Sequence, residues 1–93
     1  MRLEFETFVA DCSDKEQAVK VLEEAAEVFS AWEQADNEYL VATCGFRVLE
    51  NLGDEIADVV MAACNLAARF GLDMEKYMSR CERKNRERGM YEQ

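Results

Sequence analysis

Acidic side chains recur with one-turn spacing in two separate stretches of the sequence. The first stretch carries Glu23, Glu24 and Glu27, and the second carries Glu55 and Asp58. In a helix, residues three positions apart lie on one face, so each stretch would place carboxylates side by side. Carboxylate oxygens are the ligands that hard cations such as Mg²⁺ take in proteins. The two stretches therefore indicate a site for a divalent metal.

Nearby basic residues relieve little of the repulsion within these stretches. Lys20 lies one turn before the first stretch, and Arg47 is the only basic residue between Lys20 and Arg69. Like-charged pairs at this spacing cost an isolated helix about 0.2–0.5 kcal/mol each. A single pair of this kind is common on a solvated helix face. Two such pairs, both bordering apolar stripes, favour a bound cation.

The remaining sequence predicts helices that would position the carboxylates. Ser13 followed by Glu16 is the pattern of a capping box, which predicts a helix from about Asp14 to a break near residues 36–37. Its apolar residues at helical spacing are Ala18, Val21, Leu22, Ala25, Phe29 and Trp32. A second apolar stripe predicts a helix over residues 51–70 that Gly71 would cap.

Three further segments have weaker signals. A third helix is predicted from residue 73 or 74 to about Arg88, with Gly89 at its end. Residues 39–48 fit either a helical segment or an extended linker. Residues 3–9 fit either a short strand or a poorly packed N-terminal arm.

The carboxylates stand at the edges of the two apolar stripes. At about 100° per residue, Glu24 borders its stripe and Glu27 lies about 60° further out, and Glu55 and Asp58 repeat this relation. Packing of the stripes would gather the four carboxylates beside one helix–helix contact, as in the metal sites of helical bundles. Asn65, two turns after Asp58, is a candidate ligand contact. We expect an all-α fold, a small helical bundle that oligomerisation completes.

The C-terminal stretch is basic. Lys or Arg occupies positions 80, 83, 84, 86 and 88, and Asn85 lies among them. Interaction with the dipole at a helix C-terminus accounts for one or two of these charges. The others would either pair with the acidic helices or bind phosphate, for which Arg and Lys are the usual ligands. The sequence leaves both interpretations open.

Length and composition narrow the class of protein. The 93 residues suit one domain, residues 1–93, with an N-terminal arm at residues 1–12. A net charge of −9 argues against binding to nucleic acid or to an anionic membrane. Four cysteines without a CxxC pair, and no His, argue against a zinc site. No signal-peptide pattern or membrane-spanning apolar run is present, so we expect a cytoplasmic protein with reduced thiols.

The acidic stretches resemble the signature of the MazG-like nucleotide pyrophosphohydrolases, in the all-α nucleoside triphosphate pyrophosphatase superfamily. That signature is EExxE followed, after a variable gap, by ExxD. Glu23, Glu24 and Glu27 match its first part, and Glu55 and Asp58 match its second. The resemblance covers roughly residues 15–91. It implies a homodimer or homotetramer that uses Mg²⁺, or Mn²⁺, to hydrolyse a nucleoside triphosphate to the monophosphate and pyrophosphate.

The resemblance also implies roles for single residues. The metal would be held by Glu24, Glu27, Glu55 and Asp58. Glu23 would orient the attacking water or add a metal ligand. The substrate-binding residues would be Lys84, Asn85 and Arg88 for the phosphates, with Asn65 and Trp32 as further contacts. A Trp at helical spacing is more often part of a core than a stacking platform for a base.

A rival hypothesis involves no catalysis. The chain would be an acidic helical module that binds a partner protein, or dimerises, through the stripe containing Phe29 and Trp32. Its carboxylates would then form a solvated face. The two hypotheses differ in whether millimolar Mg²⁺ or Mn²⁺ stabilises the fold, because a ligand that binds only the native state raises its stability.

Overall fold

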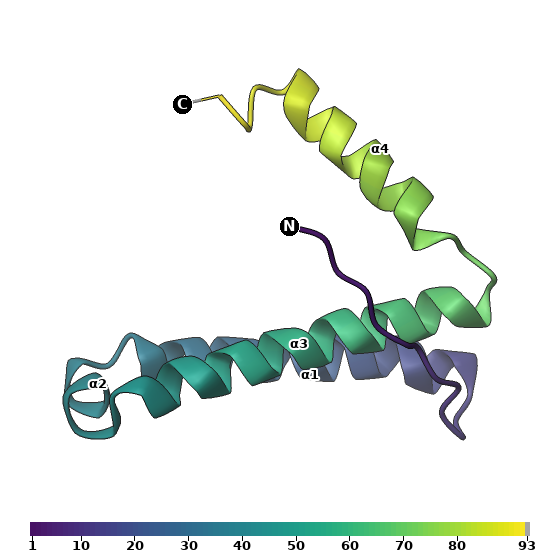
Figure 1. The fold of residues 1–93 in the computed structure, drawn as a ribbon. Helices are drawn as coiled ribbons and strands as arrows, with labels where there is room; N and C mark the ends of the chain where they lie inside the picture. Colours follow the sequence, from purple (N-terminus) through teal and green to yellow (C-terminus); the bar gives the residue numbers. More distant parts are fainter. Residues whose placement is uncertain (93) are drawn as a thin grey trace.

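The computed structural model describes residues 1–92, and their regular structure is entirely helical (Figure 1). The helices are α1 (Asp14–Ala35), α2 (Glu38–Cys44), α3 (Phe46–Arg69) and α4 (Met74–Glu87). Residues 1–92 contain no strand, which confirms the all-α class, and residues 3–9 run as an extended arm. None of the four helices is long and apolar enough to cross a bilayer.

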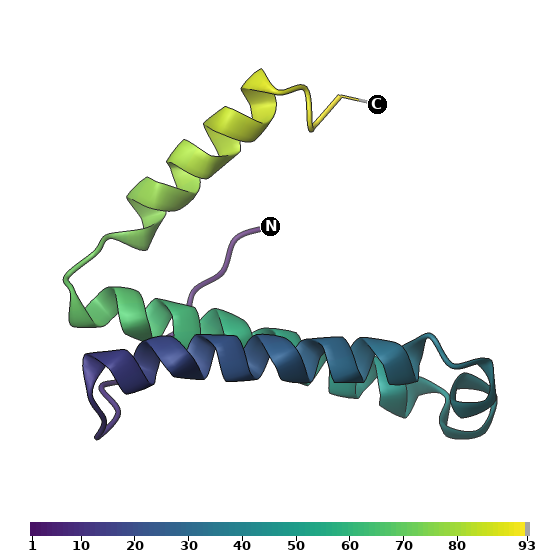
Figure 2. The same ribbon diagram turned by 180° about the vertical axis from the view of Figure 1, so that it is seen from behind.

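The helices α1 and α3 pack side by side in opposite directions, and α2 lies in the turn that joins them (Figures 1 and 2). Gln17, near the start of α1, donates from Nε2 to the carbonyl of Ala62, near the end of α3, at 3.1 Å. Two turns further along α1, Glu24 lies beside Glu55, which precedes Ala62 in α3. The predicted packing of these two helices against each other is therefore confirmed, and it is antiparallel. We call the pair the α1–α3 hairpin.

The contact between α1 and α3 is lined by buried and half-buried residues that recur at alternating spacings of four and three. We call these two lines the seam; they are Gln17, Val21, Glu24, Val28, Ala31 and Ala35 in α1, and Val48, Leu52, Glu55, Val59, Ala62, Leu66 and Arg69 in α3. This 4–3 spacing is the one that keeps a single partner helix in contact along a helix. Glu24 and Glu55 therefore occupy positions that normally carry apolar side chains.

The seam of α1 differs from its predicted apolar stripe. Leu22, Phe29 and Trp32 each follow a seam residue and remain exposed, at 71%, 60% and 48%. The prediction placed all of these apolar residues on one side of α1 and did not separate an inner line from an outer one. A single partner helix covers only the inner line of this apolar arc, so the rest of the arc faces outward.

Glycines separate the helices where the sequence allowed a break. Gly45 takes φ 52 between α2 and α3, and its amide donates to the carbonyl of Val41. The helical alternative for residues 39–48 is therefore correct, and α3 begins at Phe46 rather than near residue 51. Gly71, at φ 65, ends α3 in a Schellman motif: its amide donates to the carbonyl of Ala68, and the next amide donates to the carbonyl of Ala67.

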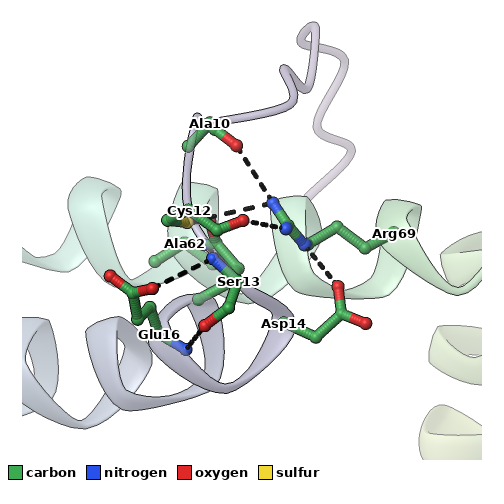
Figure 3. Close-up of polar contacts among 8 residues, drawn as sticks. Ala10, Cys12, Ser13, Asp14, Glu16, Ala62 and Arg69 are labelled. Carbon is green, nitrogen blue, oxygen red and sulfur yellow. Dashed lines mark hydrogen bonds and ion pairs between the residues drawn. The ribbon is translucent and has the colours of Figure 1, made fainter.

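The predicted capping box at the start of α1 is confirmed, and the N-terminal arm is attached beside it (Figure 3). The Ser13 hydroxyl accepts from the amide of Glu16, and the Glu16 carboxylate accepts from the amide of Ser13. Two hydrogen bonds with Ser13 lower the pKa of Glu16. The bond with the Ser13 backbone has the larger effect, and the bond with the Ser13 side chain has the smaller one. Arg69 of α3 donates to the carboxylate of Asp14 at 2.8 Å and to the carbonyls of Ala10 and Cys12.

The helix α4 stands away from the α1–α3 hairpin (Figures 1 and 2). It makes no extensive contact with α1, α2 or α3 within residues 1–92. Its five basic residues form no ion pair in the described part of the chain. Of the three or four helices expected to pack as a bundle, only α1 and α3, with α2 at their turn, do so within one chain.

Candidate metal centre

Three carboxylates from the two long helices meet within the α1–α3 hairpin. One oxygen each of Glu24, Glu55 and Asp58 lies within 4.8 Å of the other two. Glu24 and Glu55 are half-buried in the seam, and Asp58, one turn after Glu55, is exposed. We call these three residues the acidic cluster. It forms because antiparallel packing sets the middle of α1 against the middle of α3.

Two oxygens of the acidic cluster are buried without a hydrogen-bond donor. They are Oε2 of Glu24 and Oε2 of Glu55. Lys20 reaches only the other oxygen of Glu24, Oε1, at 3.3 Å, and its own side chain is 53% exposed. A buried charged oxygen without a partner is costly, and among the described residues these two Oε2 atoms have none. Carboxylate oxygens in this arrangement fit a hard divalent cation.

Glu27 lies beside the acidic cluster and is affected by its charge. The pKa of Glu27 is raised, first by hydrogen bonding to Glu24, next by the negative charge of Glu24, and then by hydrogen bonding to Glu55. A cation among these carboxylates would reverse the effect of the charges and favour ionised Glu27. Three of the four residues expected to hold the metal therefore meet in the acidic cluster, and the fourth, Glu27, lies beside it. Glu23 is exposed and outside the group of three, and its role stays a prediction.

The residues expected to bind phosphate lie on α4, away from the acidic cluster. Asn85 donates from its side chain to the sulfur of Cys81 at 3.7 Å, and Arg88 caps the C-terminus of α4. Lys84 helps to line an open polar hollow of about 470 Å³ on α4, together with Tyr77, Arg80, Cys81 and Arg83. The basic side chains are thus grouped, but α4 does not pack on the helices that carry the carboxylates.

Asn65 and Trp32, the two other residues expected to contact substrate, each interact with another residue of the chain. Asn65 is only 3% exposed, and its Oδ1 accepts from the amide of Phe8 at 2.9 Å, which holds the N-terminal arm on α3. Trp32 lies on α1 against Phe29, with ring centroids 5.7 Å apart. It is not part of the core of this chain, so its side chain is available for contacts outside the hairpin.

Sequence reasoning missed two polar residues that fix the hairpin around the site. Gln17 is 1% exposed and ties α1 to the backbone of α3, and Arg69 ties α3 to the start of α1. Gln17 lies seven residues before Glu24, and Arg69 lies fourteen residues after Glu55. A search at heptad spacing from the two glutamates would have found both, because all four share the seam.

Comparisons of the chain with models of protein families, with curated proteins and with solved structures find no match. The interpretation of the acidic cluster therefore rests on its geometry and on the spacing of its residues.

Proposed function

We propose that this protein is a Mg²⁺-dependent nucleoside triphosphate pyrophosphohydrolase, with Mn²⁺ as an alternative cofactor. The observation that supports the proposal is the acidic cluster, in which two carboxylate oxygens are buried without a donor. Phosphoanhydride hydrolysis needs positive charge at the phosphates and an activated water, and a divalent metal bound by Glu24, Glu27, Glu55 and Asp58 would supply both. The products would be the nucleoside monophosphate and pyrophosphate, from attack of water at the α-phosphorus.

Other residues of the chain would orient the water and bind the substrate. Glu23, on the exposed side of α1 next to the acidic cluster, would orient the water. Lys84, Asn85 and Arg88 would bind the phosphates, so substrate binding would draw the basic helix α4 towards the carboxylates. Asn65 and Trp32 remain candidate substrate contacts, and a homodimer or homotetramer remains the expected assembly.

The test is product analysis with a panel of nucleoside triphosphates, with and without Mg²⁺. The parent protein should release monophosphate and pyrophosphate from at least one nucleotide, and only with the metal. Glu24→Gln should lower turnover by more than the roughly 10–100-fold that loss of an outer-shell partner of a metal ligand costs. Glu33→Gln, which removes an exposed carboxylate from the same helix, is the matched control and should leave turnover unchanged. Absence of product from every nucleotide, or normal turnover in Glu24→Gln, would refute the proposal.

One observation favours the rival function, a helical module that binds a partner protein. Phe29 and Trp32 are exposed on α1, as a docking surface requires. A module of this kind would hydrolyse no nucleotide, and Mg²⁺ would leave its unfolding temperature unchanged. The metal titration and the nucleotide panel together therefore separate the two functions.

A further inference from the structure

The N-terminal arm is attached to α3 over residues 8–12. The amide of Phe8 donates to Oδ1 of Asn65 at 2.9 Å, and Asn65 is only 3% exposed. Arg69, one turn further along α3, donates to the carbonyls of Ala10 and Cys12 (Figure 3). This part of the arm therefore has a fixed place on α3, and two side chains of that helix hold it there.

The preceding part of the arm, residues 1–7, has no such attachment. Within residues 1–92, none of these seven residues takes part in a hydrogen bond or an ion pair. In Figures 1 and 2 the segment rises away from α3. Its large side chains Leu3 and Phe5 are 59% and 43% exposed. Since no polar contact of the described chain holds residues 1–7, the segment can turn about its attachment at Phe8.

The direction of the arm leads towards the acidic cluster. As its residue numbers fall, the arm passes first Arg69 and then Asn65, so it runs along α3 towards Asp58. An extended segment advances about 3.3 Å per residue and a helix about 1.5 Å. The three residues from Phe8 to Phe5 therefore span about 10 Å, and the seven from Asn65 to Asp58 span about 10.5 Å. Laid along α3, the arm would bring Phe5 level with Asp58.

The arm lies on the polar side of the hairpin. The residues that directly precede each seam position form this side, which we call the polar flank; a step of one residue turns both helices of an antiparallel pair towards the same side of their contact. Asp58 and Asn65 both belong to it. None of its members, from Glu16 in α1 to Ala68 in α3, is aromatic. Trp32 follows a seam position and so lies on the other side. A nucleotide with its phosphates at the acidic cluster therefore has no aromatic side chain of the hairpin beside its base.

The sequence of the arm suits a cover for a flat apolar group. In an extended segment, alternate side chains point to opposite sides. Leu3 and Phe5 therefore share one side, and Glu4 and Glu6 share the other. With Phe5 turned towards the hairpin, both glutamates face water, so the arm adds no carboxylate to a site that is already acidic. An aromatic ring can stack on the face of any nucleobase.

We propose that the arm completes the substrate site: residues 1–7 turn about Phe8, close over the acidic cluster and place the ring of Phe5 on the base of the bound nucleotide. This inference rests on the proposed function. It gives the base an aromatic contact on the side of the carboxylates, which Trp32 does not offer. Asn65 is then a positioning residue, because its Oδ1 holds the backbone about which the arm turns.

Calorimetric titration in Mg²⁺ tests the contact with two ligands. One is the α,β-methylene analogue of the nucleotide that the panel identifies as substrate, which cannot release pyrophosphate; the other is inorganic triphosphate, which has no base. Phe5→Ala should raise the Kd of the analogue at least about fivefold, the equivalent of about 1 kcal/mol of stacking, and leave the Kd of inorganic triphosphate unchanged. Phe5→Tyr keeps the ring and should bind the analogue as the parent does. Asn65→Ala should weaken binding of the analogue alone, as Phe5→Ala does.

The matched control is Phe46→Ala, which removes an exposed ring from the start of α3 and should leave both Kd values unchanged. Circular dichroism checks that each variant stays helical. Fluorescence reports the closure itself. Trp32 is the only tryptophan of the chain, so Phe5→Trp in a Trp32→Phe background places the single indole on the arm. The analogue should quench its emission by stacking, and inorganic triphosphate should not.

The outcomes separate this inference from the function on which it rests. If the parent binds neither ligand in Mg²⁺, the proposed function is wrong and the role of the arm is wrong with it. If the parent binds the analogue but Phe5→Ala binds it equally well, only the role of the arm is overturned. Emission of Phe5→Trp that stays unquenched at saturation with the analogue overturns it as well.

Discussion

Replacing one carboxylate of the acidic cluster by an amide should stabilise the protein when no metal is bound. Oxygens of Glu24 and Glu55 lie within 4.8 Å of each other. Two unit charges at that distance repel by about 3.5 kcal/mol at an effective dielectric constant of 20, and by about 0.9 kcal/mol in bulk water. Both side chains are half-buried, so we expect Glu55→Gln to raise the free energy of unfolding by about 1–3 kcal/mol. Its amide can also donate to the unpartnered Oε2 of Glu24.

Thermal unfolding in chelator and low salt, at one fixed protein concentration, measures this gain. In a domain of this size about 1 kcal/mol corresponds to about 4–8 °C in Tm, so the shift is readily detected. Glu50→Gln is the matched control, because it removes an exposed carboxylate from the same helix and changes the net charge equally. Saturating Mg²⁺ should offset this gain: at one hundred times Kd it should stabilise the parent by about 2.7 kcal/mol, and Glu55→Gln by much less. If Glu55→Gln and Glu50→Gln shift the Tm in chelator by the same amount, the reasoning is refuted.

Three further predictions concern Glu27, Arg69 and the basic residues at the end of the chain. The pKa of Glu27 is raised, so the folded state binds the proton of this carboxyl more tightly than the unfolded state does. This proton binding stabilises the fold below the ordinary pKa of 4.5, and the stabilisation is lost as the pH rises through the pKa of the folded state. In chelator, the parent should therefore lose stability relative to Glu27→Gln as the pH rises above 4.5, and parallel pH profiles of Tm would contradict this. Arg69→Met should cost about 1–3 kcal/mol and speed amide exchange in residues 8–13, with the Mg²⁺ response intact; unchanged exchange would show that the arm is held by other contacts. If Lys84 and Arg88 bind phosphate, Lys84→Ala and Arg88→Ala should each raise KM or lower kcat and leave the Mg²⁺ response of the free protein intact. If they instead pair with the acidic helices, each variant should lose only about 0–1 kcal/mol of stability and keep normal kinetics.

The elements of the fold could be predicted because their signals are local. The capping box at Ser13, the break near residues 36–37 and the Schellman glycine at position 71 each depend on a few neighbouring residues. The convergence of the carboxylates could also be predicted, since it needs only helical spacing and antiparallel packing.

The burial pattern could not be predicted in the same way. The apolar arc of α1 is wider than one partner helix can cover, and the sequence does not say which line of that arc the partner takes. The outward position of Phe29 and the buried position of Gln17 follow from that choice. Likewise, the composition of α4 shows that it is basic and amphipathic, but not that it leaves the hairpin at Gly71.

The positions of the glutamates bear on the choice between the two functions. A protein that used its acidic helices only for solubility would carry apolar residues in the seam and keep its carboxylates on the flanks. Here Glu24 and Glu55 occupy seam positions, where apolar side chains would stabilise the hairpin more. An interaction module accounts for the exposed Phe29 and Trp32, but gives no reason for that loss of stability, whereas a metal site does. Because Phe29 and Trp32 are exposed outside the seam that carries Glu24 and Glu55, contacts through these aromatic side chains would leave the carboxylates free to hold the proposed metal.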